Sequence, residues 1–289
     1  MDDKNASQHP NYVQVFLTFA RNSLVRDMMF RTNFIIEAIS SLSWALMNVG
    51  FYWIVFEHTP SIGADTGWGK YEFFIFMATT WIINSIVQAF FMPNSEEFSE
   101  MIRTGGLDFV LLKPIDTQFL VSLRKVHWSS LSNFLLGMGL LVLSINELQD
   151  RPTAPWKLTP SIVGLYAVYC ACGVAILYSL MTCLASTSVW LGRNQTLYDF
   201  WFYITNFSRY PMEIYRRGWG IVLWVVFTFI VPVLLVVNVP ARILAQPLAD
   251  NTSWRWPLAM FTIFAAIISV LISRWVFQRS LLAYRSASS

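Results

Sequence analysis

The residue types that most often carry catalysis or bind metals are few in this sequence. Its three histidines are His9, His58 and His127, and each lies outside the centres of the apolar runs described below. A serine–histidine pair or a histidine metal site within a membrane would need such a side chain at that depth. The sequence therefore predicts no catalytic residue and no metal site, and we expect that the chain is not an enzyme by itself.

Two further patterns that could bind a metal or a nucleotide are incomplete. Cys170, Cys172 and Cys183 are an odd number within one apolar run and have no histidine nearby, so they indicate neither a disulfide framework nor a zinc site. Residues 64–71 resemble a phosphate-binding loop but lack the first glycine and the final hydroxyl residue of that motif. We therefore expect the chain to bind no cofactor.

Polar side chains inside the apolar runs are the remaining candidates, because such groups are costly in a bilayer. Asn84 and Gln88 are four residues apart and share one helix face, and Asn48 and Asn133 lie in the neighbouring runs. These amides either join neighbouring helices, at about 0.6 kcal/mol each, or give a substrate a mildly polar path. Of the two interpretations we favour the first, in which the amides join neighbouring helices.

The fifth apolar run contains Pro232 and, near its end, Asn238. Proline removes a backbone hydrogen bond and kinks a helix, and the Asn238 side chain can satisfy a carbonyl that the kink sets free. Broken helices are tolerated in membranes where they line a cavity. The kink is therefore either an extracytoplasmic gate or a fixed bend that shapes helix packing.

The composition around these side chains is that of a membrane protein. Of the 289 residues, 55% are hydrophobic and only 13% are charged, and the mean hydropathy is +0.49. A soluble domain carries about 25% charged residues, so this charge is too sparse to cover a soluble surface. The net charge of +3 is spread thinly rather than clustered, which excludes a nucleic-acid-binding face.

Six runs are long and apolar enough to span a bilayer core, which needs roughly 20 helical residues. They are residues 34–56, 73–93, 128–146, 161–185, 219–239 and 256–277. The predicted fold is therefore all-α, a polytopic membrane protein with six transmembrane helices in a domain at residues 34–277.

The basic residues orient these spans, because Lys and Arg stay on the cytoplasmic side in short loops. Fifteen of the 20 lie in the N-terminal segment 1–33, in the loops after the second and fourth runs, or near the C-terminal tail 278–289. The loop after the fourth run contributes Arg193, Arg209, Arg216 and Arg217 to this side. Both termini are therefore expected in the cytoplasm, with the chain in a bacterial cytoplasmic (inner) membrane.

The N-terminal segment is expected to form an amphipathic helix. Between residues 12 and 31, apolar side chains recur at helical spacing and polar side chains occupy the opposite face. Such a helix lies in the cytoplasmic interface with its basic side towards lipid headgroups, or it packs on the flank of the protein. The two arrangements are compatible with each other.

The loop at residues 94–127 carries a second, shorter amphipathic helix with both ends marked in the sequence. Ser95 is expected to accept hydrogen bonds from its first N–H groups. Gly105 or Gly106 is expected to end it in a left-handed conformation. The expected helix therefore covers residues 95–106.

Phe98, Met101 and Ile102 form one apolar stripe along this short helix. A helix of this length is marginal in water by itself, so the stripe must pack on something. It packs either on the chain's own helices or in a groove of a partner. We favour the partner groove, because the helix hangs between two spans on the cytoplasmic side.

Residues 97–116 resemble the I-R-x-G-x-L-D-x-x-L-L-[KR]-P-[IV]-D signature between the second and third spans of ABC type-2 membrane permeases. A second resemblance covers residues 209–215, before the fifth span, and residues 236–242 at its far end. The spans, the termini and the motif loops follow the family order over the whole chain. One departure is Gly106, where many members carry glutamate.

The resemblance implies one half of an exporter. Two permeases, identical or paralogous, would pair within the membrane lipid and bind two cytoplasmic ABC ATPases, which would hold ATP and magnesium. The helix at residues 95–106 would then couple ATPase closure to the spans. The residues expected at this contact are Glu96, Glu97, Phe98, Glu100, Met101, Ile102, Arg103, Gly105 and Gly106.

The expected translocation path follows the polar positions within the spans. They are Asn48, Asn84, Gln88, Asn133, Pro232 and Asn238. The alternative function is an ATP-independent secondary transporter or channel, which would need charged residues at mid-membrane for ion coupling. The sequence alone identifies no substrate.

Overall fold

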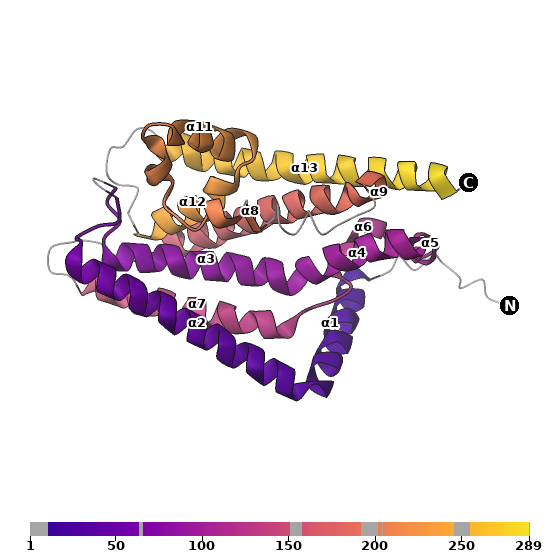
Figure 1. Ribbon diagram of the computed structural model, residues 1–289, viewed down its shortest axis with the longest axis horizontal. Coiled ribbons are helices and arrows are strands. Elements are labelled where there is room, and N and C mark those ends of the chain that lie inside the picture. The colour runs from indigo at the N-terminus through magenta and orange to yellow at the C-terminus, as the bar shows by residue number, and fades with distance from the viewer. Residues whose placement is uncertain are drawn as a thin grey trace.

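The computed structural model describes residues 11–63, 66–150, 158–191, 202–203, 205–245 and 255–288. Every regular element in these ranges is helical. The helices are α1 (Tyr12–Met29), α2 (Arg31–His58), α3 (Lys70–Phe90), α4 (Met92–Thr104), α5 (Leu107–Leu111), α6 (Thr117–Leu123), η1 (Trp128–Ser130), α7 (Leu131–Gln149), α8 (Pro160–Ser186), α9 (Ser188–Leu191), η2 (Met212–Arg216), α11 (Gly220–Val225), η3 (Val226–Ile230), α12 (Val233–Ala245) and α13 (Arg255–Ser288). The long helices α3, α7, α8 and α13 run along the long axis of the molecule, and α4 to α6 lie at one end (Figure 1).

Among the described residues, five helices are long and apolar enough to cross a membrane, and they coincide with five of the six predicted runs. They are Arg31–His58, Lys70–Thr104, Trp128–Gln149, Pro160–Leu191 and Trp256–Tyr284. The sixth candidate is a pair of helices, Gly220–Ile230 and Val233–Ala245, bent by 85°. The structure thus supports a helical protein with several membrane-spanning segments.

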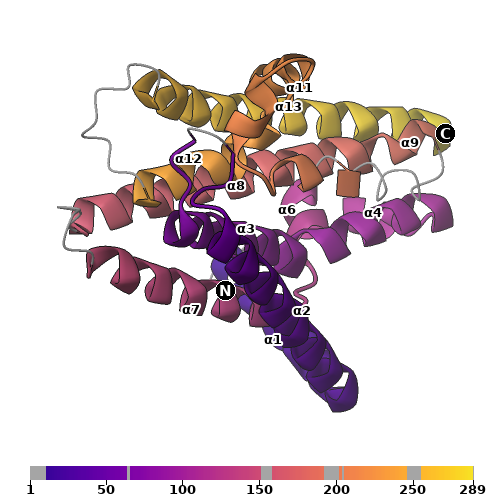
Figure 2. The same ribbon diagram turned by 60° about the vertical axis from the view of Figure 1, so that its left-hand side comes forward.

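Helix α3 lies at the centre of the bundle, where it packs on α7, α8 and α12. The apolar part of the helix Lys70–Thr104 is 72% buried, whereas the corresponding part of α2 is only 6% buried. The corner between α1 and α2 projects away from the other helices in both views (Figures 1 and 2). The monomer therefore has one enclosed span and one that is almost uncovered.

A glycine lets two of the central helices touch. A Cβ atom added at Gly173 of α8 would lie 2.7 Å from the carbonyl oxygen of Val236 in α12 and 3.2 Å from the side chain of Ile83 in α3. Small residues of this kind allow close backbone approach between membrane helices. The crossing of α8 and α12 therefore requires glycine at this position.

The second span continues into the loop instead of ending where the apolar run ends. Pro93 has no N–H group, so the helix is interrupted for one residue. The Ala89 carbonyl, four residues earlier, accepts a hydrogen bond from the His127 N–H at 2.8 Å. The Phe90 carbonyl accepts one from the Asn94 side chain at 2.7 Å. Because both carbonyls are satisfied, α4 follows α3 directly.

The fifth run, which the sequence predicted as a kinked span at residues 219–239, forms two helical segments that meet at a sharp bend. The π-helical turn η3 is followed by a break at Pro232, and α12 then leaves at 85° to α11 and η3. The kink itself is confirmed, and its angle is far larger than a proline alone usually gives. Every residue of α12 is buried among α3, α8 and α13.

The N-terminal helix α1 is attached to the flank of the protein at the loop end. The Trp128 indole N–H donates to the Ala20 carbonyl at 3.1 Å, and the Ser23 hydroxyl accepts from the Val126 N–H at 3.1 Å. Asp27 accepts from the Trp128 N–H at 3.2 Å. Packing on the flank is therefore confirmed, and the position of the exposed face in a lipid interface stays a prediction.

One part of the predicted orientation is wrong. The sequence placed the loop with Arg209 on the cytoplasmic side, opposite Trp68 and Arg242. In the structure, Glu213 of that loop contacts both Trp68 and Arg242. This stretch has therefore turned back along the bundle, and its arginines do not mark the cytoplasmic face.

Substitution of Gly173 by alanine is expected to destabilise the protein. The added methyl group would meet a backbone oxygen, and such overpacking costs about 1–3 kcal/mol. Thermal unfolding of the purified protein in detergent should show a lower midpoint for Gly173→Ala than for the wild type.

Gly164→Ala is the matched control, because it lies on the same helix and has no atom within 4 Å of the added methyl group. Alanine has the higher helix propensity, by about 1 kcal/mol, so the midpoint of this variant should be unchanged or higher. Equal midpoints for the two variants would contradict the close crossing of α8 and α12.

Candidate functional site

A polar cavity of about 200 Å³ lies between α2, α3, α7 and the segment before η2. It is lined by Trp44, Asn48, Tyr52, Phe73, Met77, Thr80, Trp81, Asn84, Ser85, Gln88, Asn133, Arg209 and Tyr210. The four amides that the sequence singled out, from three different helices, therefore face one space. This cavity is the candidate functional site within the spans.

The amides are not used to join helices. The Asn48 side chain donates to the Trp44 carbonyl of its own helix at 2.8 Å. Over the part of the chain that the structure describes, the side chains of Asn84, Gln88 and Asn133 make no hydrogen bond. Within the described residues the favoured interpretation, hydrogen bonds between neighbouring helices, is therefore wrong, and the polar path stays a prediction.

Asn238 lies outside this cavity and has a structural role. Its side chain is buried, accepts a hydrogen bond from the Met212 N–H at 2.7 Å, and donates to the Leu234 carbonyl at 2.8 Å. A longer contact of 3.5 Å reaches the Tyr210 carbonyl. Asn238 thus holds the segment that carries Arg209 and Tyr210 against the bundle.

Pro232 is also outside the cavity, at the break before α12.

A buried ion pair fixes the same segment further along. The Arg242 guanidinium pairs with Glu213, whose second oxygen accepts a hydrogen bond from the Trp68 indole at 3.0 Å. The guanidinium also lies over the Trp68 ring, 5.3 Å from its centre. The carboxylate of Glu213 is thus neutralised by Arg242.

Among the lining residues that sequence reasoning missed, Arg209 is the charged one. The charge count assigned it to an aqueous loop, and no apolar run marks the stretch around it. The contacts of Asn238 and Glu213, together with the buried Met212 side chain, bring this stretch back beside α2 and α3.

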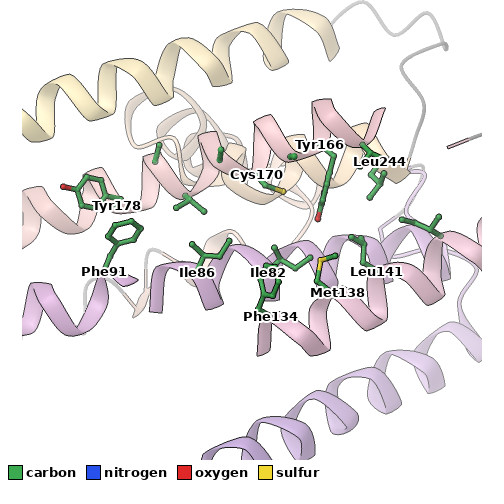
Figure 3. Close-up of a pocket in the computed structure, with 16 residues that line it drawn as sticks. Ile82, Ile86, Phe91, Phe134, Met138, Leu141, Tyr166, Cys170, Tyr178 and Leu244 are labelled. Atoms are coloured by element: carbon green, nitrogen blue, oxygen red, sulfur yellow. The ribbon is translucent and has the colours of Figure 1, made fainter. Parts of the chain in front are cut away.

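A second, larger cavity of about 710 Å³ lies between α3, α7 and α8 (Figure 3). Ile82 and Ile86 of α3, Met138 of α7 and Cys170 of α8 are among its lining residues. Its lining has no charged or amide side chain, and it contacts the face of α3 opposite Asn84. This groove can accommodate apolar chains, but it offers little for polar recognition.

The start of the loop helix differs from the prediction, and its end agrees with it. The Ser95 hydroxyl donates to the Phe91 carbonyl at 3.1 Å and caps no N–H group, because α4 already begins at Met92. Gly105 ends the helix in the left-handed conformation, with φ of +72°, as expected.

The apolar stripe of this helix packs on the chain's own helices, so the favoured partner groove is wrong for its two main residues. Phe98 and Met101 are 1% and 8% exposed. The Phe98 ring lies 5.4 Å from that of Phe277 in α13, and both residues belong to a cluster with Leu120 of α6. Neither side chain is free to enter a partner.

The outward surface at this end is instead formed by the next helix. Leu107 and Val110 bury α5 against the cluster, while Phe109 and Leu112 are 74% and 82% exposed. We refer to Phe109 and Leu112 as the loop tip.

The predicted contact residues Glu96, Glu100 and Arg103 are exposed on α4, whereas Glu97 is partly buried beside Lys125 at 3.1 Å. Ile102 and the two glycines are half-buried.

The loop tip is fixed to two spans through α6. Arg274 of α13 forms a two-armed ion pair with Asp116 and donates to the Gln118 side chain at 2.8 Å. Gln118 in turn donates to the Tyr178 hydroxyl of α8 at 3.0 Å. Asp116 also caps α6 by accepting from the Phe119 N–H at 2.9 Å. A force on the tip is therefore transmitted to α8 and α13.

One family model, described as "ABC-2 family transporter protein", matches residues 42–288. The match runs from the middle of α2 to α13 and so contains both the polar cavity and the loop tip. No curated protein and no solved structure gave a significant match to this chain.

Replacement of Asp116 by asparagine is expected to destabilise the loop end by about 1 kcal/mol or more, because it removes charge-assisted hydrogen bonds to Arg274. Arg274 holds the pKa of the Asp116 carboxyl below its ordinary value of 3.8. The stabilisation is therefore present above about pH 4 and is lost as the pH falls through the lowered pKa. Thermal unfolding of wild type and variant at several pH values measures this difference.

Glu100→Gln provides the control. Glu100 also pairs with an arginine, Arg103, but both side chains are largely exposed, and exposed pairs stabilise by little. This variant should unfold close to the wild type at every pH. If Glu100→Gln lowered the thermal stability as much as Asp116→Asn does, the lower exposure of the Asp116–Arg274 pair would be unimportant.

Proposed function

Because the chain belongs to the ABC-2 family of transporter proteins, we propose that it is the transmembrane permease subunit of an ATP-binding-cassette exporter. The observation that carries the proposal is the family match over residues 42–288, which spans the membrane helices and the loop between them. The polar cavity supports it, since a permease needs a polar path among its spans. The expected location is a bacterial cytoplasmic membrane, with both termini in the cytoplasm.

The functional unit is a pair of permeases, identical or paralogous, with two cytoplasmic ABC ATPases that bind ATP and magnesium. The exposed α2 supports a pair, because Ala45 is the one residue of this helix that is buried in the monomer. The polar cavity opens beside α2, and polar groups facing lipid are costly. A second copy on this side would enclose the cavity.

The loop tip is the contact for the ATPase. Phe109 and Leu112 are the apolar side chains that the described loop leaves uncovered, and Arg103 and Lys113 beside them are exposed as well. Apolar anchors ringed by charge are typical of protein interfaces. The earlier candidates Phe98 and Met101 have a different task, because they hold α4 against α13.

Movement of the tip reaches the cavity through two connections. One is α4 with α3, whose residues Asn84 and Gln88 line the cavity. The other is the Asp116–Arg274 pair with α13. Closure of the ATPases around the tips thereby changes the positions of the helices that surround the path.

The decisive variants are Phe109→Asp and Leu112→Asp. A carboxylate at the centre of an apolar contact removes an anchor residue. It weakens the free energy of binding to the ATPase by about 1 kcal/mol or more for each residue. We expect the double variant to insert into the membrane and to lose most of the ATPase that copurifies with the wild type. The ratio of ATPase to permease after affinity purification measures the effect.

Gln278→Asp is the matched control for each single variant, since it adds one carboxylate at an exposed position of α13 at the same end of the bundle. It should copurify the ATPase as the wild type does. If the double variant also retains the ATPase, the tip is not the contact. If no ATPase copurifies with the wild type and transport proceeds without ATP, the secondary-transporter alternative is correct.

A further inference from the structure

The polar cavity lies at the depth of the spans. On α2, Tyr52 is six residues from the helix end at His58, which corresponds to about 9 Å along the axis. On α3, Gln88 is 18 residues from the start at Lys70, or about 27 Å. The cavity therefore lies alongside the transmembrane helices α2 and α3, and the segment with Arg209 and Tyr210 closes one side of it.

Arg209 lines this cavity, although it is exposed in the monomer, and its positive charge has no partner there. It forms no ion pair or side-chain hydrogen bond within the described residues, and no acidic side chain lines the cavity. The acid nearest to it in sequence, Glu213, is paired with Arg242. An arginine at membrane depth is costly unless an anion or a water-filled space compensates it. The site thus has an unbalanced charge.

The groups around Arg209 are suited to an acceptor-rich ligand. The amides of Asn84, Gln88 and Asn133 can each donate two hydrogen bonds, and a guanidinium presents a planar fork to an anion. Together, the amides and the guanidinium offer more hydrogen-bond donors than the two oxygens of a carboxylate can accept. A phosphate group presents three strong acceptor oxygens. At about 200 Å³ the cavity is smaller than the pockets of whole drug-sized ligands, which are about 300–1,000 Å³.

We propose that this cavity binds a phosphate group of the transported molecule, with Arg209 as the direct anion ligand and the amides of α3 and α7 as further donors. The inference rests on the proposed function and names the substrate class for the same path. Asn238 and the Glu213–Arg242 pair serve as positioning residues, since they fix the backbone on the C-terminal side of Arg209.

The test uses the full-length permease in uncharged maltoside micelles and two probes. Inorganic phosphate represents a soluble substrate, and its binding is followed by the shift of the thermal unfolding midpoint against chloride at equal ionic strength. Phosphatidylglycerol represents a lipid headgroup, and its retention is counted by native mass spectrometry. A response to the first probe assigns a soluble phosphate, and a response to the second assigns a lipid phosphate.

Arg209→Gln should weaken binding of the responding probe about tenfold or more, because it removes the charge-assisted pair. Arg217→Gln is the matched control, since it removes an equal charge from the same segment at an exposed position outside the cavity. Its binding should equal that of the wild type. Asn84→Asp tests the site without removing Arg209, because the new carboxylate supplies an internal counter-ion and should abolish binding.

Several results would overturn the proposal. They are a wild type that responds to neither probe, or Arg209→Gln and Asn84→Asp variants that bind as the wild type does. A third is that Arg209→Gln causes the permease pair to dissociate while the binding of the phosphate probe stays unchanged. That result would show that a second copy of the permease neutralises Arg209. ATPase copurification should be normal in every cavity variant. The two proposals can therefore fail independently. A permease that binds no phosphate can still bind its ATPase through the loop tip, and a permease that loses the ATPase can still bind phosphate.

Discussion

Burial of α3 among α7, α8 and α12 is the constraint on which the other features depend. A helix enclosed on several sides must present a different surface to each neighbour. The face with Ile82 and Ile86 borders the apolar groove, and the face with Asn84 and Gln88 borders the polar cavity. Since α4 continues α3 into the loop, the same element also connects the cavity with the end where a partner would bind.

The second requirement is that a polar segment stays at membrane depth. The stretch that carries Arg209 forms little regular structure of its own, and side chains of α12 hold it. Asn238 satisfies the backbone around Pro211, and Arg242 pairs with Glu213. Irregular backbone is tolerated in membranes where it is packed in protein or lines a cavity. Helix α12, which follows the bend at Pro232, therefore holds the segment with Arg209 in place.

The sequence predicted features that depend on local physics. Five apolar runs coincide with span-length helices, and Gly105 ends α4 in the left-handed conformation. It failed where the outcome depends on tertiary packing. The stripe of Phe98 and Met101 showed that one face of a helix is buried, but only the position of α13 decides what covers it. Arg209 was misplaced because a charge count assumes that every stretch between apolar runs lies in water.

The central claim is that the loop tip and the cavity move together when a partner ATPase binds ATP. It can be measured by pulsed electron paramagnetic resonance on the paired complex, in a background without the three free cysteines. Spin labels are placed at Lys113, beside the tip, and separately at Gln88, in the cavity wall, both of which are exposed in the monomer. The account predicts that the distance between the two copies changes at both sites on ATP binding. A change at Lys113 with none at Gln88, or no change at either site, would contradict it.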